Sequence, residues 1–289
     1  MRRSMMFLPG NSPAMLMNGT VLPADCLILD LEDAVSPDQK DAARLLVKGA
    51  LQNFDYGRRE IVVRINDLET PEWEADLDEI LQGKLHLIMP PKVAGAAHVE
   101  KLDAALTERE KKFGLEEGSI GILPLIETAL GVENAFQIAS ASPRVRGLFL
   151  GGEDLSADLR CPRTLEGKEI FYARTRLIVA ARAAGVDVID TPFTDTNDME
   201  GLKNDAKFAR SLGFTGKAVI SPRHLDSVNE VFSPTAKDIL WAKDVMAAIE
   251  MGKKEGKGAV SLNGKMIDKP IVMRAEQILA AERELAEGV

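Results

Sequence analysis

Short apolar segments recur along the 289 residues, and each is followed by a longer segment whose apolar residues repeat with helical period. Several of the short segments are β-branched runs without polar alternation, as expected of parallel strands that are covered on both faces. Few architectures suit a chain with this alternation, because parallel strands are joined by crossover helices. The candidate strands are residues 4–8, 25–29, 60–65, 85–89, 119–125, 145–150, 186–190 and 217–220.

Eight strands that alternate with helices predict an α/β protein of the (β/α)₈ TIM barrel class. The turn residues agree with this reading, since Ser36-Pro37-Asp38 precedes one helical stretch and Gly185 and Gly213 follow two others. A doubly wound open sheet is the alternative, because strand order cannot be read from the sequence.

The composition of the chain changes after the helical stretch 235–251. Residues 252–258 are rich in glycine and lysine, which is typical of a hinge. A short apolar piece at 259–262, a tight turn at Asn263-Gly264 and a final helix from about residue 270 to 287 follow. We expect a barrel over residues 1–256 and a C-terminal lid or oligomerisation segment over residues 257–289.

Charge and cysteine content limit the function classes. The formal net charge is −9, which disfavours a general binder of nucleic acid or anionic lipid. No stretch approaches the roughly 18–20 apolar residues that span a bilayer. Cys26 and Cys161 form no CxxC pair, so we expect reduced thiols and a cytoplasmic protein.

Polar residues gather where the predicted strands end, and the carboxyl ends of barrel strands carry the active sites of this fold. Most of them are carboxylates, which repel one another unless a cation or protons offset them. Mg²⁺ suits such a site because it needs only one or two carboxylates beside water and substrate oxygens. His86, His98 and His224 lack zinc-ligand spacing. The residues at the strand ends are Asp30, Glu32, Asp33, Arg64, Asn66, Lys92, Glu127, Glu153, Asp154, Asp190 and Thr191.

Structural roles are open for several of these residues. Glu127 can be an acid that favours a helix N-terminus, Asp154 can be a turn residue, and Asp33 can be an N-cap. Gly151-Gly152 favours a tight backbone excursion that would present Asp154. No P-loop, Rossmann or GxSxG motif competes with a metal site.

Two cationic residues have a functional and a structural interpretation. Arg64 either forms a buried salt bridge with Glu32 or Asp33, or binds a substrate carboxylate with both arms of its guanidinium. Lys92 either helps to neutralise an anion or is only surface charge.

With these residues placed, the chain resembles the citrate lyase β-subunits, within the wider family of malyl-, citramalyl- and citryl-thioester lyases. The likeness runs along essentially the whole chain, in short pieces that stand in the same order. The matching pieces are Arg3-Ser4-Met5-Met6-Phe7-Leu8-Pro9-Gly10-Asn11, Asp30-Leu31-Glu32-Asp33-Ala34-Val35, Val63-Arg64-Ile65-Asn66, Pro91-Lys92, Ile126-Glu127-Thr128, Leu150-Gly151-Gly152-Glu153-Asp154-Leu155, Gly216-Lys217-Ala218-Val219-Ile220-Ser221-Pro222 and Asn263-Gly264-Lys265-Met266-Ile267-Asp268.

The resemblance implies a Mg²⁺-dependent carbon–carbon lyase that cleaves a citryl thioester to oxaloacetate and an acetyl thioester. Glu127 and Asp154 match the metal ligands, with Glu127 also close to the substrate. Arg64 matches the arginine that binds the oxaloacetate-like half. Asp268 matches an acid on a C-terminal lid, which in relatives reaches the active site of a neighbouring subunit.

The remaining expectations concern the other side chains of the site. We expect Glu32 or Asp33 to remove the hydroxyl proton, directly or through water, and Asp268 to protonate the enolate. Lys92 and Asp30 complete the expected substrate-binding set. One position departs from many relatives, because Ser221 stands where they have histidine.

Alternatives remain for the substrate and the assembly. The chain can instead be a malyl-CoA or citramalyl-CoA lyase, a related thioester enzyme of aldol or Claisen type, or a non-catalytic scaffold. Expected partners are the acyl thioester and oxaloacetate, a carrier protein and transferase subunits of a citrate lyase complex, and further copies of the chain in a trimer or hexamer. CoA and a carrier protein are both open as the acyl carrier.

Overall fold

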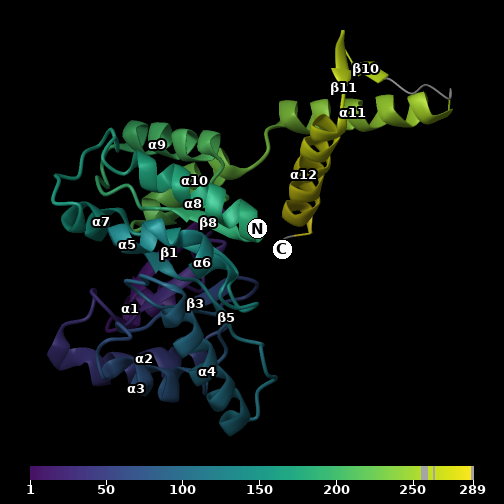
Figure 1. Ribbon diagram of the computed structural model, residues 1–289. Coiled ribbons are helices and arrows are strands. Elements are labelled where there is room, and N and C mark those ends of the chain that lie inside the picture. The colour runs from purple at the N-terminus through teal and green to yellow at the C-terminus, as the bar shows by residue number, and fades with distance from the viewer. Residues whose placement is uncertain (255–259, 263, 288–289) are drawn as a thin grey trace. The chain divides into compact units, whose positions relative to one another are not determined.

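The computed structural model describes residues 1–254, 260–262 and 264–287. The chain divides into two compact units, one formed by Arg2–Phe232 and the other by Ser233–Val289 together with Met1 (Figure 1).

The first unit is built around a sheet in which every described strand pairs with its neighbours in parallel. Its order is β5-β4-β3-β2-β1-β9-β8-β7-β6. The strands are β1 (Ser4–Pro9), β2 (Cys26–Asp30), β3 (Glu60–Arg64), β4 (Leu87–Met89), β5 (Gly121–Ile122), β6 (Leu125–Ile126), β7 (Gly147–Leu150), β8 (Asp187–Asp190) and β9 (Gly216–Val219).

The two ends of this sheet meet, because β5 and β6 belong to one extended segment interrupted only by Leu123-Pro124. On one side of this segment, the Leu123 amide donates to the Ile88 carbonyl at 2.9 Å. On the other side, the Pro124 carbonyl accepts from the Phe149 amide at 3.0 Å. With β5 and β6 counted as one strand, the sheet is therefore a closed eight-stranded barrel. This confirms the predicted fold class and rules out the open sheet.

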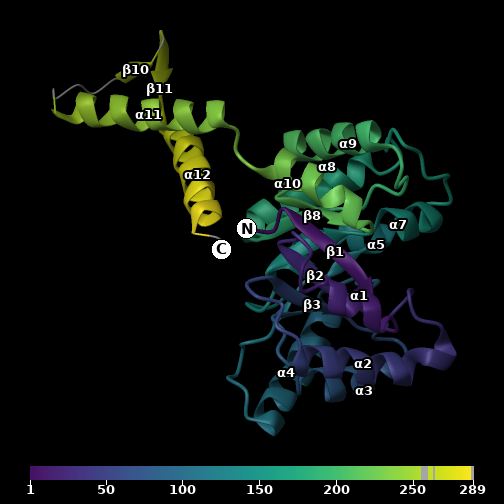
Figure 2. The same cartoon turned by 180° about the vertical axis from the view of Figure 1, so that it is seen from behind.

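Helices follow the strands and cover the outside of the barrel (Figures 1 and 2). Gly185 and Gly213 end two of them with φ of 74° and 118°, which confirms the helix ends predicted there. The α-helices of this unit are α1 (Pro13–Asn18), α2 (Lys40–Asn53), α3 (Glu72–Ile80), α4 (Ala96–Phe113), α5 (Ala129–Glu133), α6 (Ala135–Ser140), α7 (Gly152–Asp158), α8 (Phe171–Ala184), α9 (Met199–Leu212) and α10 (Leu225–Phe232). Two short 3₁₀ helices, η1 (Pro37–Gln39) and η2 (Pro222–His224), precede α2 and α10.

Strand alternation separates an inner core from an outer one. Side chains that point outward pack beneath the helices in the larger core, whereas those that point inward fill the barrel. The inner core contains Met5, Cys26, Ile28, Val62, Leu87, Met89, Leu123, Leu125, Phe149, Ile189 and Ala218. Because strand side chains alternate, the residue two positions after such a core residue points into the barrel mouth.

The second unit contains α11 (Ala236–Lys254), β10 (Val260–Leu262), β11 (Lys265–Ile267) and α12 (Lys269–Ala286). It has its own small core, in which Ala242 and Val245 of α11 are buried with Ile267 and Ala275. Because α11 packs with α12 and β10, the unit begins at Ser233, earlier than the boundary expected after residue 256.

The predicted turn of this unit lies between β10 and β11, which pair antiparallel. Gly264 has φ of 78°, as a tight turn requires, while Asn263 lies outside the described residues. The predicted hinge 252–258 falls partly on residues 255–259, which also lie outside them, and residues 252–254 continue α11. In the described parts of the chain, no helix is long and apolar enough to cross a membrane.

Candidate active site

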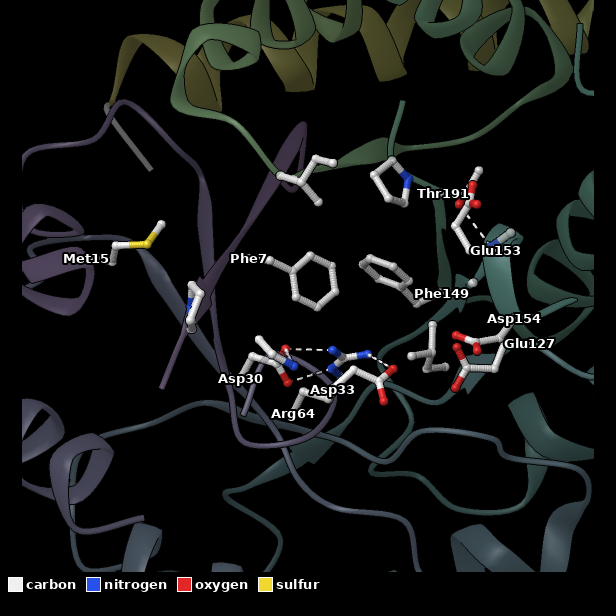
Figure 3. A pocket seen from close by; sticks show the side chains of 17 residues that line it. Phe7, Met15, Asp30, Asp33, Arg64, Glu127, Phe149, Glu153, Asp154 and Thr191 are labelled. Carbon is white, nitrogen blue, oxygen red and sulfur yellow. Dashed lines mark hydrogen bonds and ion pairs between the residues drawn. The ribbon is translucent and has the colours of Figure 1, made fainter. Parts of the chain in front are cut away.

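A pocket of about 420 Å³ opens at the carboxyl ends of the barrel strands (Figure 3). It combines an apolar wall with a few charged groups, which is typical of a small-molecule site. The described residues that line it are Phe7, Pro9, Met15, Asp30, Asp33, Ala34, Arg64, Leu125, Glu127, Phe149, Gly151, Gly152, Glu153, Asp154, Thr191, Pro192 and Ile220.

Arg64 ends β3 and lines the pocket, where its guanidinium forms a bidentate ion pair with Asp30. Its Nε and Nη2 donate to the two carboxylate oxygens of Asp30 at 2.7 and 2.6 Å. The two residues are direct neighbours in the register of β2 and β3, which explains the pairing. Burial alone would lower the pKa of Arg64, but the hydrogen bonds and charge of Asp30 raise it, so Arg64 stays cationic.

The third nitrogen of Arg64 faces the other two acids that follow β2. Nη1 lies 2.9 Å from Glu32 Oε2 and 3.7 Å from Asp33 Oδ2. The guanidinium carbon also lies 5.2 Å from the centre of the Phe7 ring, in cation–π geometry. The salt bridge considered with Glu32 or Asp33 is therefore present, but the bidentate partner is Asp30.

Glu32 and Asp33 differ in their surroundings. Glu32 is buried, and its second oxygen accepts from Lys92 Nζ at 2.8 Å. Burial raises the pKa of Glu32, although Arg64 and Lys92 favour its charged form. The Asp33 side chain is 59% exposed, and of these two acids it is the one that lines the pocket.

Glu127 and Asp154 bring two carboxylates together in the same pocket (Figure 3). Glu127 follows β6 and is 2% exposed, while Asp154 stands in the first turn of α7. Burial, then the charge of Asp154, raises the pKa of Glu127 to about 8. The charged form of the buried Glu127 carboxylate is disfavoured by the second carboxylate beside it. A bound cation would stabilise both carboxylates in their charged form.

The donor set of this pair fits Mg²⁺, which binds through one or two carboxylates and completes its shell with water and substrate oxygens. Within the described ranges, no group of three or more His, Cys, Asp and Glu side chains is arranged to hold a metal. Glu127 and Asp154 are the residues that would hold the ion.

The position of Glu127 is fixed by its neighbours. The backbone amide of Lys92 donates to Glu127 Oε1 at 2.8 Å, from a residue in the left-handed conformation with φ of 52°. A Cβ added to Gly151 would lie 2.7 Å from Glu127 Cβ and closer still to Oε2. Gly151 itself has ordinary backbone angles, φ −98° and ψ 92°. The glycine is required by this close approach rather than by a backbone excursion.

Lys92 therefore contacts the site in two ways. Its side chain pairs with Glu32 and is 40% exposed, and its backbone supports Glu127. Lys92 is therefore more than a surface charge, which was one of the two interpretations that the sequence allowed.

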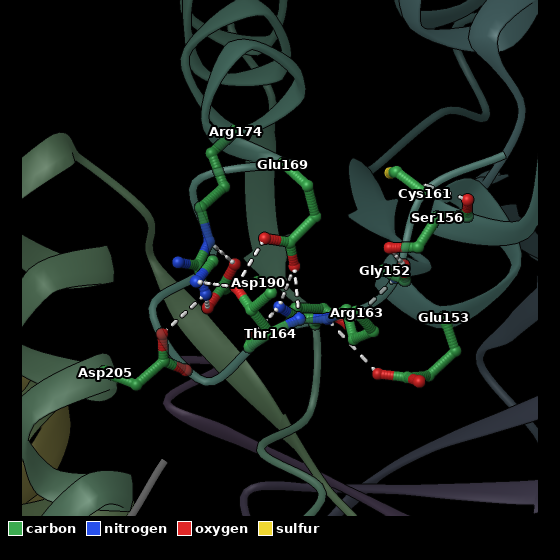
Figure 4. Close-up of polar contacts among 12 residues, drawn as sticks. Gly152, Glu153, Ser156, Cys161, Arg163, Thr164, Glu169, Arg174, Asp190 and Asp205 are labelled. Atoms are coloured by element: carbon green, nitrogen blue, oxygen red, sulfur yellow. Dashed lines mark hydrogen bonds and ion pairs between the residues drawn. The ribbon is translucent and has the colours of Figure 1, made fainter. Parts of the chain in front are cut away.

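Two polar residues expected near the strand ends point away from the pocket. Asp190 faces outward from β8 and joins Arg174, Asp205 and Lys217 in a buried ion-pair cluster (Figure 4). Asn66 is buried outside the pocket lining and donates to a carboxylate oxygen of Asp76 at 2.8 Å. Strand alternation accounts for Asp190, since the preceding residue belongs to the inner core.

Asp268 lies in the C-terminal unit, as the N-cap of α12. Its side chain is exposed and accepts a hydrogen bond from the Ile271 amide at 3.2 Å. A role for it in the barrel site stays a prediction.

Part of the apolar wall of the pocket was not predicted from the sequence. Phe7 and Phe149 meet edge to face with ring centres 5.8 Å apart, and Ile220 lies on the same pocket. A signal for two of them was present, because Phe7 and Ile220 come two residues after Met5 and Ala218 of the inner core.

Comparison with known proteins agrees with this site and fold. The family model of the HpcH/HpaI aldolase/citrate lyase family matches residues 3–222. The chain is 45% identical to the citrate lyase subunit beta of Leuconostoc mesenteroides subsp. cremoris, over 96% of this chain and 92% of that protein. It is 34% identical to the mitochondrial citramalyl-CoA lyase of Rattus norvegicus, over 99% and 87%.

A solved structure shares the fold along nearly the whole chain. The protein CitE of Mycobacterium tuberculosis, crystallised with magnesium, acetoacetate and coenzyme A, matches with a TM-score of 0.79 and 30% identity over 98% of each chain. The resemblance seen in the sequence motifs is thereby confirmed. The chain belongs to the HpcH/HpaI aldolase/citrate lyase family.

Proposed function

We propose that this chain is a Mg²⁺-dependent lyase that cleaves the carbon–carbon bond of a citryl thioester to oxaloacetate and an acetyl thioester. One observation carries the proposal: a buried, permanently cationic Arg64 and the carboxylate pair Glu127–Asp154 line the same pocket. The higher identity to a citrate lyase β-subunit than to a citramalyl-CoA lyase supports the choice of the citryl unit.

Arg64 would orient a carboxylate of the substrate. Its guanidinium is locked by Asp30 and stacked over Phe7, so little rotamer entropy is lost when an anion binds. The aromatic wall would exclude water from the reacting centre.

Glu127 and Asp154 would hold the ion in the same pocket as this cation. Mg²⁺ supplies Lewis-acid polarisation of a substrate oxygen when it is bound. The Lys92 amide and the close contact with Gly151 would keep Glu127 in the position that this ion requires.

Asp33 would accept the hydroxyl proton, directly or through water. It lines the pocket and is exposed to it, whereas both oxygens of Glu32 are engaged by Arg64 and Lys92. Glu32 would then act by holding these two cations in place.

Asp268 would protonate the enolate. This residue belongs to the C-terminal unit that begins at Ser233, which would act as a lid and oligomerisation segment. Its exposed position at the start of α12 leaves the carboxylate accessible to another surface. We propose that the lid acts between copies in a trimer or hexamer, and that a carrier protein and transferase subunits are further partners.

A panel of thioesters tests the proposal. We expect citryl-CoA or a citryl carrier protein to release oxaloacetate in the presence of Mg²⁺, with a kcat/KM above that for malyl-CoA or citramalyl-CoA. Preferred release of glyoxylate or pyruvate would assign the chain to the malyl- or citramalyl-CoA lyases instead. A chain that cleaves none of the panel would have the role of a scaffold.

A further inference from the structure

We propose that Thr191 is a positioning residue for the metal site, which it serves by holding the start of the helix that carries Asp154. The proposal rests on the proposed function, in that Asp154 is taken as a ligand of Mg²⁺. Thr191 itself is fully buried and follows β8.

The contact that carries the proposal joins Thr191 to Gly152, the first residue of α7. The Gly152 amide donates to Thr191 Oγ1 at 2.9 Å (Figure 3). This amide is one of the first N–H groups of a helix, which find no partner within the helix. The N-cap Gly151 carries no capping side chain, and the acceptor comes from Thr191, which follows the neighbouring strand β8.

Gly152 and Thr191 also fit each other sterically. A Cβ on Gly152 would lie 2.7 Å from Thr191 Oγ1 and 3.1 Å from its Cγ2. A larger residue at either position would therefore push the helix start and the end of β8 apart.

Thr191 is in turn held by the buried ion-pair cluster around Asp190, of which Figure 4 labels Asp190, Arg174 and Asp205. Lys217 Nζ donates to the Thr191 carbonyl at 2.7 Å. The same ammonium lies 2.6 Å from Asp190 Oδ2 and 2.6 Å from Asp205 Oδ2. Arg174 completes the cluster by contacting both carboxylates. With two cations against two anions, the cluster is balanced and fixes the end of β8 against α8 and α9.

The start of α7 is thus attached to the barrel on two sides. The Gly151 amide donates to the Ile126 carbonyl at 3.0 Å, just before Glu127, and Gly152 is attached to Thr191. Asp154 follows two residues later, in the same helical turn. Loss of the Thr191 contact would leave one attachment and let this turn move relative to Glu127.

The experiment measures Mn²⁺ binding to the full-length protein by the EPR signal of the free ion, since Mn²⁺ takes the same oxygen ligands as Mg²⁺. Thr191→Val removes the acceptor at nearly constant volume, and Thr191→Ser keeps the hydroxyl. Thr215→Val is the matched control, because Thr215 Oγ1 bonds the backbone of Val188 at the opposite end of β8. Thermal unfolding without metal records the structural cost of each change.

We expect Thr191→Val to weaken Mn²⁺ binding by about 10- to 100-fold, as substitutions behind metal ligands do. Thr191→Ser and Thr215→Val should bind Mn²⁺ like the wild type, even if Thr215→Val lowers the Tm. Gly152→Ala breaks the same contact from the helix side and should reproduce the loss, which keeps the test valid if Thr191→Val does not fold.

Two results would overturn the inference alone: wild-type affinity in Thr191→Val, or an equal loss in Thr215→Val. Asp154→Asn separates these from a failure of the proposed function. If the wild type binds no Mn²⁺, or if Asp154→Asn binds Mn²⁺ as the wild type does, the proposed metal site is wrong. The proposed role of Thr191 is then wrong as well.

Discussion

Replacing Gly151 by alanine tests whether the space beside Glu127 is reserved for the carboxylate. The backbone of Gly151 has φ −98° and ψ 92°, which an alanine adopts without strain. The whole effect must therefore come from the new methyl group. It would lie 2.7 Å from Glu127 Cβ, against the 3.4 Å at which ordinary contact begins.

The size of the effect follows from this overlap. Glu127 must move away until its contact with the new methyl group reaches van der Waals distance. Its carboxylate is closer to that methyl group than its Cβ is, so it must move by about 1 Å. A displacement of that size costs about 100-fold in rate in a preorganised site. Overpacking of this kind also destabilises the fold by about 1–3 kcal/mol. We therefore expect the Mg²⁺ concentration for half-maximal activity to rise and kcat/KM at saturating Mg²⁺ to fall about 100-fold.

The assay is steady-state release of oxaloacetate from citryl-CoA over a range of Mg²⁺ concentrations. Gly49→Ala is the matched control, because a Cβ there meets nothing within 4 Å. Since Gly49 lies inside α2, alanine should leave activity unchanged and stabilise the protein by about 0.5–1 kcal/mol. Wild-type kinetics and Mg²⁺ dependence in Gly151→Ala would refute the steric argument.

Three further predictions concern other parts of the molecule. Lys217→Met removes one of the two cations that balance the buried Asp190 and Asp205, so urea unfolding at pH 7 should show a loss of about 3–5 kcal/mol. A loss below about 1 kcal/mol would contradict the cluster's role. Burial alone would raise the pKa of Glu169, but hydrogen bonds from Thr164 lower it to about 2. The carboxylate therefore stabilises the fold at pH values above its ordinary pKa of 4.5, and this contribution is lost as the pH falls towards 2. The stability difference between wild type and Glu169→Gln should therefore shrink from pH 5 to pH 2, and a constant difference would speak against it. Asp268→Asn should bind oxaloacetate but turn over poorly, and equal mixing with Arg64→Ala should restore about a quarter of the activity if the lid acts between subunits, with no recovery if it acts within one.

The barrel was predictable because its signal is repeated along the chain. Eight short apolar segments alternate with helical ones, and no single segment decides the outcome. Details of individual strands were less accessible. The predicted strand at 119–125 is divided into β5 and β6, because Pro124 has no amide hydrogen for the ladder.

The composition of the site was predictable, but not its pairing. The sequence placed Arg64, Glu127 and Asp154 near strand ends, where the structure brings them into one pocket. The bidentate partner of Arg64 depends on the register between β2 and β3, which sets Asp30 opposite it and which no local pattern reveals. The outward direction of Asp190 could have been read from strand alternation, whereas its buried partners Arg174 and Lys217 come from other elements of the chain.

The central claim is that Glu127 and Asp154 hold the Mg²⁺ on which cleavage of the citryl thioester depends. The most direct measurement is release of oxaloacetate from citryl-CoA, with and without Mg²⁺, by the wild type, Glu127→Gln and Asp154→Asn. We predict that EDTA abolishes release by the wild type, that added Mg²⁺ restores it, and that neither variant recovers wild-type activity at any Mg²⁺ concentration. Full activity of both variants at the wild-type Mg²⁺ requirement would contradict the account.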